Sequence, residues 1–320
     1  MTEQLNVQQM AEKLLTADDI LILCHKNPDG DTVGCGSALY YALSALDKTA
    51  AVLCSDPVPS RYAFTNPRLY KGEFEPQIVV AVDVASLQLF GENNGMPQFS
   101  RHVDLCIDHH AGNSGYAEFT LLDGTAAAAA ELLYEVLCAM GVDLTPHIAN
   151  CLYTGLSTDT GCFQYSNTTA DTLRIAAACK DAGADTYPIN KLFFGTKSFA
   201  RLKLEARLTG SAEFYADGKV ALVELPQAWL DELGASEDDV DSIAGFARAI
   251  EGVELGITVR DVEGGNGKLS LRTSGTYNAC ELCRELGGGG HAAAAGATVP
   301  GGIAGAKRAI LDVLRRKGII

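Results

Sequence analysis

Short, almost uninterrupted apolar runs alternate with longer alanine-rich or amphipathic runs through the first half of the chain. The apolar runs lie at residues 20–25, 50–55, 78–85 and 103–108. Strands that are buried on both faces of a parallel sheet have this composition, whereas half-exposed strands alternate apolar and polar residues. Helices are predicted from periodicity and end signals at residues 33–46, 124–140, 145–156 and 168–182. The alternation of strands and helices predicts an α/β domain with a doubly wound, mostly parallel sheet.

The second half of the chain has a different pattern. Strand-like runs flank tight turns, at 212–215 with 220–225 and at 256–260 with 268–272, which is typical of β-hairpins. Further helices are predicted at 239–250, 279–286 and 303–317. We therefore expect a smaller C-terminal α+β domain. The expected division is a first domain over residues 1–186, a helical linker over 187–209 and a second domain over 210–320.

The charge of the chain restricts its partners. The 320 residues include 25 basic and 40 acidic side chains, which gives a net charge of −15. A protein that binds long duplex nucleic acid needs a basic surface to replace the counterions of the phosphates. The acidic balance therefore argues against a long duplex and favours a small anionic substrate.

Other features of the composition indicate a cytoplasmic protein. The N-terminus is polar and acidic, unlike a signal peptide, and no apolar run reaches the roughly 20 residues of a membrane span. The ten cysteines are scattered, several of them inside apolar runs, which favours reduced thiols over a disulfide framework. Cys280 and Cys283 form a single Cys-x-x-Cys pair in a predicted helix, so a structural role is favoured over a zinc site.

Aspartate and histidine recur at the C-terminal ends of the predicted strands or in the turns after them. The carboxyl ends of parallel strands meet at one edge of a sheet, so these side chains are expected to converge. A cluster of carboxylates needs cations to neutralise it, and a carboxylate at the end of a central strand, Asp83, could bridge two of them. The expected metal ligands are His25, Asp29, Asp31, Asp83, His109 and Asp159.

Two divalent cations would activate a hydroxide as the nucleophile of a phosphoryl displacement and stabilise its attacking and leaving oxygens. Oxygen and imidazole donors without a thiolate favour Mn(II), with Mg(II), Fe(II) and Co(II) as alternatives. Next to the ligands, Asp108 is expected to orient an imidazole by accepting a hydrogen bond from its ring N–H. His110 is expected to act on the substrate, and two roles stay open: contact with the scissile phosphate, or donation of a proton to the leaving oxygen.

A glycine-rich segment precedes the last candidate histidine. Consecutive glycines offer backbone N–H groups that a phosphate can approach closely. An arginine at the end of a preceding predicted strand could grip a terminal phosphate with its forked guanidinium. This substrate clamp, expected to face the metals across a cleft between the domains, consists of Arg272, Gly288, Gly289, Gly290 and His291.

Taken together, these motifs resemble those of the DHH phosphoesterase superfamily, and in particular its NrnA-like nanoRNase and pAp phosphatase branch, related to RecJ. The matching segments are His-Lys-Asn-Pro-Asp-Gly-Asp at 25–31, Val-Asp at 82–83, Asp-His-His at 108–110, Thr-Asp-Thr-Gly at 158–161 and Gly-Gly-Gly-Gly-His at 287–291. The resemblance implies a catalytic domain with a dinuclear Mn(II) centre, held by the same six ligands, and a DHH-associated C-terminal domain.

The resemblance also implies a substrate class. Members of this branch hydrolyse short oligoribonucleotides and 3′-phosphoadenosine 5′-phosphate (pAp). Asn113 falls at the asparagine of the family pattern Asp-His-His-x-x-Asn and is therefore counted among the substrate-binding residues. Gln164, in the segment 160–168, stands where relatives are often basic. Ala126 to Ala130 has no counterpart in these motifs and is taken as a run of good helix formers.

Three alternatives to this function stay open. A phosphodiesterase of cyclic dinucleotides or of their linear products would use the same metal centre. A pyrophosphatase would share Asp-His-His but lack the glycine-histidine clamp, which argues against it. A non-catalytic nucleotide- or RNA-binding protein would be expected to have lost some of the ligands. Relatives are often dimers, but no interface can be identified in this sequence.

Overall fold

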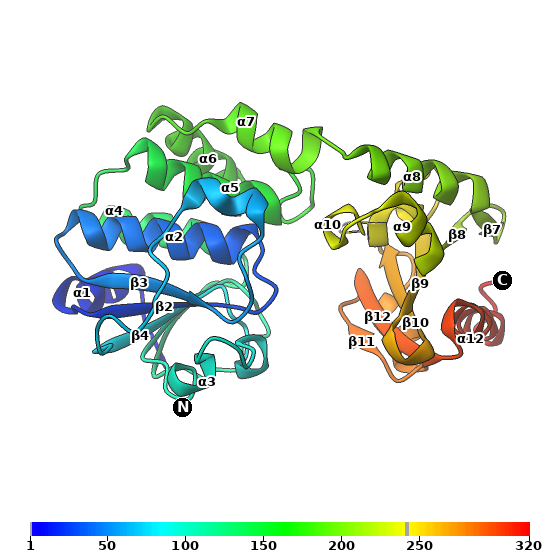
Figure 1. Ribbon diagram of the computed structural model, residues 1–320, viewed down its shortest axis with the longest axis horizontal. Helices are drawn as coiled ribbons and strands as arrows, with labels where there is room; N and C mark the ends of the chain where they lie inside the picture. The colour runs from blue at the N-terminus through cyan, green and yellow to red at the C-terminus, as the bar shows by residue number, and fades with distance from the viewer. Residues whose placement is uncertain (1, 241–242) are drawn as a thin grey trace. The chain divides into compact units, whose positions relative to one another are not determined.

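The protein is described by a computed structural model that covers residues 2–240 and 243–320 (Figure 1). The chain divides between Thr196 and Lys197 into two compact units, each with a six-stranded sheet. The predicted fold class, an α/β domain followed by a smaller domain with mixed secondary structure, is confirmed. In the part of the chain that the structure describes, no helix is both long enough and apolar enough to span a bilayer.

The sheet of the first unit is entirely parallel, with the strand order β1-β6-β5-β4-β2-β3. The four predicted strands are present and their residues are almost all buried. Two further strands, one at the N-terminus and one after the Asp-His-His motif, were not expected. The strands are β1 (Glu3–Gln4), β2 (Ile20–Cys24), β3 (Ala50–Cys54), β4 (Ile78–Val82), β5 (Leu105–Asp108) and β6 (Phe119–Leu122).

Helices cover one face of this sheet, and their apolar side chains form the main core with every second residue of the strands (Figure 1). They are α1 (Val7–Thr16), α2 (Gly30–Ala45), α4 (Ala129–Ala139), α5 (Pro146–Asp159) and α6 (Ala170–Asp181). The opposite face is covered by α3 (Met96–Phe99) and by loops, whose buried residues include Phe90 and Val103. The ends of β2, β4 and β5 lie between these layers.

The helices α2 and α5 approach each other closely because glycines face the contact. A Cβ atom on Gly34 of α2 would lie 2.4 Å from the carbonyl oxygen of Cys151 in α5. A Cβ atom on Gly155 of α5 would lie 2.4 Å from Oδ1 of Asp31. No side chain fits at either position, so the two glycines set how near α5 comes to the acidic start of α2.

The sheet of the second unit is mixed, with the order β11-β12-β10-β9-β8-β7. Both predicted hairpins are confirmed, because β7 pairs antiparallel with β8 and β9 pairs antiparallel with β10. The two hairpins join through a parallel pairing of β8 with β9. The strands are β7 (Glu213–Tyr215), β8 (Val220–Leu225), β9 (Leu255–Val262), β10 (Asn266–Thr273), β11 (Gly289–Gly290) and β12 (Ala294–Pro300).

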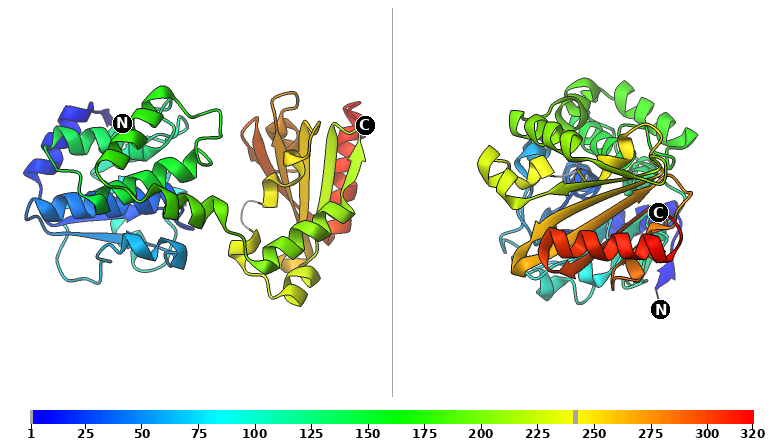
Figure 2. Two further views of the ribbon diagram at one scale, coloured as in Figure 1. Left: turned by 90° about the horizontal axis from the view of Figure 1, so that it is seen from above. Right: turned by 90° about the vertical axis from the view of Figure 1, so that its right-hand side faces the viewer.

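Helices flank this second sheet on both sides. One face packs against α11 (Ala279–Arg284) and α12 (Gly302–Arg316), and Figure 2 shows α12 lying along the strands. The other face packs against α8 (Phe199–Ser211) and α9 (Gln227–Leu233). The segment expected as a helical linker, residues 187–209, contains most of α7 (Thr186–Asn190), a π-helical turn at Lys191–Gly195 and most of α8.

The single helix predicted over residues 239–250 is wrong. The described part of this segment contains the end of α10 (Glu237–Val240) and two 3₁₀ turns, Ile243–Gly245 and Ala247–Ala249. Residues 241–242 lie outside the described residues. Gly245 lowers the helix propensity of this segment, and Ile243 and Ala247 are buried against the sheet as separate short turns.

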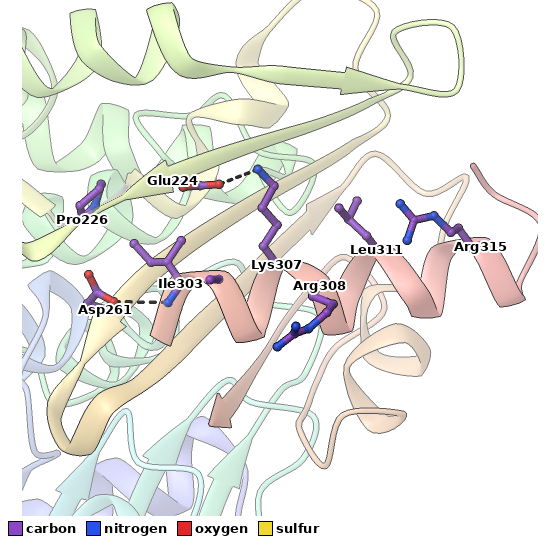
Figure 3. Close-up of a pocket in the computed structure, with 9 residues that line it drawn as sticks. Glu224, Pro226, Asp261, Ile303, Lys307, Arg308, Leu311 and Arg315 are labelled. Carbon is purple, nitrogen blue, oxygen red and sulfur yellow. Dashed lines mark hydrogen bonds and ion pairs between the residues drawn. The ribbon is translucent and has the colours of Figure 1, made fainter. Parts of the chain in front are cut away.

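A groove of about 620 Å³ lies beside α12 in the second unit (Figure 3). Lys307 of α12 donates to Glu224 of β8 at 2.7 Å, and the backbone N–H of Ile303 donates to Asp261 at 3.3 Å. Arg308 and Arg315 also line the groove. Its lining includes none of the expected site residues.

Candidate active site

The six expected ligands come together at the carboxyl ends of the first sheet. They form two trios, and within each trio the possible ligand atoms lie within 4.8 Å of one another. One trio is His25, Asp29 and Asp83, and the other is Asp31, His109 and Asp159.

Asp83 lies between the two trios with one carboxylate oxygen toward each. Its Oδ2 is 3.6 Å from Nε2 of His25, and its Oδ1 is 3.5 Å from Nε2 of His109. The residue follows β4 in a left-handed conformation, with φ of 58°, which aspartate tolerates better than most residues. Its backbone N–H donates to Ile107 at the end of β5. This is the arrangement of a carboxylate that could bridge two cations.

The first trio is held largely by the turn that links β2 to α2. Asp29 is the N-cap of α2, and its Oδ1 accepts hydrogen bonds from the backbone N–H groups of Asp31 and Thr32 at 3.1 and 3.2 Å. The Nδ1 atom of His25 lies 2.7 Å from the carbonyl oxygen of Lys26, which leaves Nε2 for the site. The residue after Asp29 has to be a glycine, because a Cβ atom on Gly30 would lie 2.3 Å from Oγ1 of Thr158.

The second trio depends on segments that are distant in sequence. Asp31 is fully buried and accepts hydrogen bonds from the backbone N–H groups of Ala129 and Ala130, at 2.6 and 3.1 Å. Nδ1 of His109 lies 3.1 Å from the carbonyl oxygen of Ala126. Its Nε2 therefore points to the site, 3.3 Å from Oδ2 of Asp159.

Two expectations about this region are corrected by the structure. Asp159 was expected at a strand end or in a turn, but it is the last residue of α5. The run from Ala126 to Ala130 was expected to be helical throughout, whereas α4 begins at Ala129 and Ala128 is extended. The physical reason is that the carbonyl of Ala126 contacts His109 and the first N–H groups of α4 bind Asp31, and these contacts fix the start of the helix against the helix preference of alanine.

Asp108 orients one imidazole, as expected, and that imidazole belongs to His110. Its Oδ1 is 2.8 Å from Nδ1 of His110 and also accepts from the backbone N–H of His109 at 2.9 Å. Its Oδ2 accepts from Nδ2 of Asn113 at 2.6 Å. The Oδ1 atom of Asn113 accepts from the N–H of Gly115. Both ends of this amide have protein partners, which favours a positioning role for Asn113 over the expected contact with substrate.

The expected clamp residues meet at one end of the second sheet. Arg272 on β10 lies opposite Ala294 of β12, and Gly290 on β11 lies opposite the next residue of β12. The backbone N–H of His291 donates to Ala294, and its side chain is exposed. Gly288 has to be a glycine, because a Cβ there would lie 2.2 Å from the carbonyl oxygen of Gly296.

The chain matches known proteins in both units. Residues 19–156 match the DHH family, N-terminal domain, and residues 217–317 match the DHHA1 domain. A protein of Thermus thermophilus named bifunctional oligoribonuclease and PAP phosphatase NrnA is 32% identical over 290 residues, which cover 88% of this chain and 84% of the relative. The chain belongs to the DHH family. The expected family and enzyme class, a metal-dependent phosphoesterase, are confirmed.

Other proteins are similar to this chain at lower identity. The Bacillus subtilis protein of the same name is 24% identical over 289 residues, covering 88% of this chain and 90% of the relative. The crystal structure of an exopolyphosphatase-related protein from Bacteroides fragilis aligns with a TM-score of 0.87 at 24% identity, covering 97% of this chain and 96% of that one. RecJ of Thermus thermophilus, in a structure with Mn²⁺, aligns with a TM-score of 0.54 at 14% identity, covering 97% and 54%. These structures share the DHH fold.

The DHH centre of this chain, formed by the two trios, contains buried polar atoms that have ion-pair neighbours but no hydrogen-bond partner among the described residues. Oδ1 of Asp83 and Nε2 of His109 are buried and accept or donate no hydrogen bond among the described residues. Buried polar atoms are almost always satisfied, so the pair marks a place for a further group. Each trio supplies two carboxylates and one imidazole, a donor set suited to a hard or borderline divalent cation. The residues present therefore fit a pair of cations.

The electrostatics of the DHH centre point the same way. Burial lowers the pKa of His25, but Asp29 and Asp83 outweigh it and raise the pKa to about 11. Burial likewise lowers the pKa of His109, and the carboxylates of Asp159, Asp31 and Asp83 raise it to about 10. Burial and Asp159 raise the pKa of Asp31 to about 7. Without cations, the crowded carboxylates favour protons on the two imidazoles and on Asp31, and cations would replace these protons.

Proposed function

We propose that this DHH protein hydrolyses the phosphodiester bonds of short oligoribonucleotides and the 3′-phosphate ester of pAp, with two divalent cations, preferably Mn(II). The observation that supports this most strongly is the pair of ligand trios joined by Asp83. The names of the relatives from Thermus thermophilus and Bacillus subtilis support the substrate class.

The proposed ligands would hold the cations, and other residues would act on the substrate. Two bound cations stabilise charge on the attacking and leaving oxygens and activate water. Asp108 fixes Nδ1 of His110, so that Nε2 is available to the substrate, and the His110 side chain is 44% exposed. Two roles for His110 remain open: contact with the scissile phosphate and proton donation to the leaving oxygen.

We assign the second unit to substrate binding. Arg272, the backbone N–H groups of Gly288 to Gly290, and His291 would bind one phosphate or one end of the substrate. A clamp of this kind accepts short strands, and the net charge of −15 disfavours long duplexes. The first unit would carry the chemistry, the segment before α8 would act as the linker, and the protein would work in the cytoplasm.

The proposal is tested by assaying the purified full-length protein with Mn(II) against a diribonucleotide, pAp, cyclic-di-AMP and pyrophosphate. We expect turnover of the diribonucleotide and pAp, little of the cyclic dinucleotide and none of pyrophosphate. Preferred hydrolysis of cyclic-di-AMP or pyrophosphate would replace the proposed substrate class. Binding of nucleotides without turnover of any of the four substrates would favour a binding protein.

The two-cation assignment is tested by Asp83→Asn, which keeps the size of the side chain and removes its charge. We expect kcat/KM to fall by about 10³-fold or more, because loss of charge stabilisation at both cations raises the barrier by several kcal/mol. Asp171→Asn, at an exposed acid on α6, is the control and should retain full activity. Near-normal activity of Asp83→Asn with Mn(II) would contradict the bridging role.

A further inference from the structure

Asn167 lies in the loop between α5 and α6, and it is not among the expected site residues. Its Nδ2 group donates two hydrogen bonds, to the carbonyl oxygen of Ala127 at 3.1 Å and to that of Asp159 at 3.1 Å. The carbonyl of Asp159 is one of the last in α5, where the helix itself supplies no partner. A single side-chain amide therefore ties the end of α5 to the turn before α4.

The turn that Asn167 holds at Ala127 carries the anchors of the other two ligands. The preceding carbonyl, of Ala126, faces Nδ1 of His109. The N–H groups two and three residues after Ala127 bind the carboxylate of Asp31. All three members of the trio Asp31, His109 and Asp159 are thus linked, directly or through one hydrogen bond, to the two segments that Asn167 joins.

A second residue holds Ala127 from the other side. The N–H of Ala127 donates to Oε1 of Glu131 at 3.3 Å, and the hydroxyl of Thr172 donates to the same oxygen at 2.5 Å. Glu131 is only 6% exposed. With its N–H bound by Glu131 and its carbonyl by Asn167, Ala127 is fixed in both directions.

The other trio is held by different contacts. The hydrogen bonds to Asp29 come from the backbone of Asp31 and Thr32, and that to His25 involves Lys26. The contacts of Asn167 are therefore specific to one half of the centre.

We propose that Asn167 is a positioning residue for the cation site of Asp31, His109 and Asp159, and that its loss weakens binding of one cation and spares the other. The inference rests on the proposed two-cation function. Partners that orient metal ligands contribute about 10- to 100-fold in metal affinity when removed. We expect an effect of that size on the second Mn(II).

The test compares the full-length protein with Asn167→Asp, which removes both donors at nearly constant size. Mn(II) binding is measured by calorimetry and by electron paramagnetic resonance, which distinguishes a spin-coupled pair from an isolated ion. We expect two Mn(II) per chain in the native protein, with a coupled spectrum. The variant should bind one Mn(II) with near-native affinity and the other about 10- to 100-fold more weakly, with an uncoupled spectrum at low metal.

Asn94 provides a matched control, because its Nδ2 also donates to two backbone carbonyls, those of Cys54 and Ser55, at 3.1 and 3.0 Å. Asn94→Asp should keep both Mn(II) and the coupled spectrum. Asn167→Ala, which introduces no charge, should lose the same cation as Asn167→Asp and guards against a folding defect specific to the aspartate.

The outcomes separate the two claims. Two Mn(II) bound with native affinity by both Asn167 variants would overturn the inference, as would parallel loss of both cations from the variants of Asn167 and Asn94. Fewer than two Mn(II) in the native protein would instead overturn the two-cation centre of the proposed function.

Discussion

At the scale of single residues, the two histidines of the trios each use one ring nitrogen for a contact with the backbone and direct the other to the site. Nδ1 of His25 and Nδ1 of His109 each lie beside a backbone carbonyl, so both rings present Nε2 to the centre. Such partners fix the tautomer and the orientation of a metal-binding imidazole. The ligand geometry is therefore set by the fold before any cation is present.

The protonation of the two histidines gives a prediction about cation binding. With pKa values raised to about 11 and about 10, His25 and His109 are protonated at pH 8 in the cation-free protein. A cation needs the neutral imidazoles, so Mn(II) binding must release at least two protons at this pH. Affinity should therefore increase as the pH rises from 6 to 9, by roughly tenfold per pH unit for each proton displaced.

Calorimetry at pH 8 in buffers of different ionisation enthalpy measures the number of protons released. His147→Gln, at a histidine that belongs to none of the groups of possible metal ligands among the described residues, is the control and should leave this number unchanged. Release of fewer than one proton would show that the imidazoles are neutral in the cation-free protein and would contradict the pKa shifts.

At the scale of helices and strands, close contact between α2 and α5 brings the second trio together. Gly155 faces Asp31 with no space for a side chain, and Gly30 faces Thr158 in the same way. The ligands on these two helices can only approach as near as the glycines allow. The glycines thus determine the spacing of the expected ligands although they supply no ligand atom themselves.

Gly155→Ala should therefore impair both stability and cation binding. Its Cβ would meet Oδ1 of Asp31 at 2.4 Å and Cβ of Ala130 at 2.9 Å. Overpacking a buried contact of this kind lowers the free energy of unfolding by about 1–3 kcal/mol. Gly210→Ala, in α8 with nothing near its Cβ, is the control and should raise stability by roughly 0.5 kcal/mol. Denaturant unfolding measures the stability of both variants. Equal changes in the free energy of unfolding for Gly155→Ala and Gly210→Ala would exclude the steric explanation.

The elements that sequence predicted well are those with a strong local signal. Strands buried on both faces are continuous apolar runs, and β2 to β5 were found on that basis. The start of α4 was missed because an alanine run favours a helix equally at each position, so only the hydrogen bonds to Asp31 and His109 decide where it begins. Strand β1 has two residues, both exposed, and forms only by pairing with β6, so its own sequence carries no signal.

The convergence of the six expected ligands was predictable for the same kind of reason, and the residues that hold them in place were not. Asp and His residues that follow apolar strands form a pattern that can be recognised in the sequence alone. Asn167 acts through two backbone carbonyls. Every residue has a backbone carbonyl, so the sequence does not indicate which carbonyls accept from Asn167. Its role is visible only when α4 and α5 are seen side by side.

At the scale of the whole molecule, acidic side chains outnumber basic ones, so an anionic substrate depends on basic groups close to its binding site. The net charge of −15 repels a polyanion at a distance. Arg272 lies near the end of β10, and β12 separates it from the glycine strand β11. The clamp would therefore supply attraction over a short range only, which suits substrates with few phosphates.

Arg272→Gln should accordingly raise KM and leave kcat nearly unchanged. A charge-assisted hydrogen bond contributes about 1.5–3 kcal/mol, which corresponds to a KM increase of at least about tenfold. The KM of the native protein should rise with ionic strength, and that of the variant should rise less steeply. Arg308→Gln, at the groove beside α12 shown in Figure 3, should change neither. A fall in kcat without a change in KM would place Arg272 in the chemistry.

The two trios differ in how they can assemble during folding. The first trio needs the turn that carries His25 and Asp29 and also Asp83, which directly follows β4, whereas the second trio extends from Asp31 through His109 to Asp159 at the end of α5. Closing such long loops is slow, and the last ligand arrives only when α5 has docked on the sheet. In the proposed two-cation centre, the site for the second cation would therefore form only after α5 has docked on the sheet. A newly made chain would be able to hold one ion before it is able to catalyse.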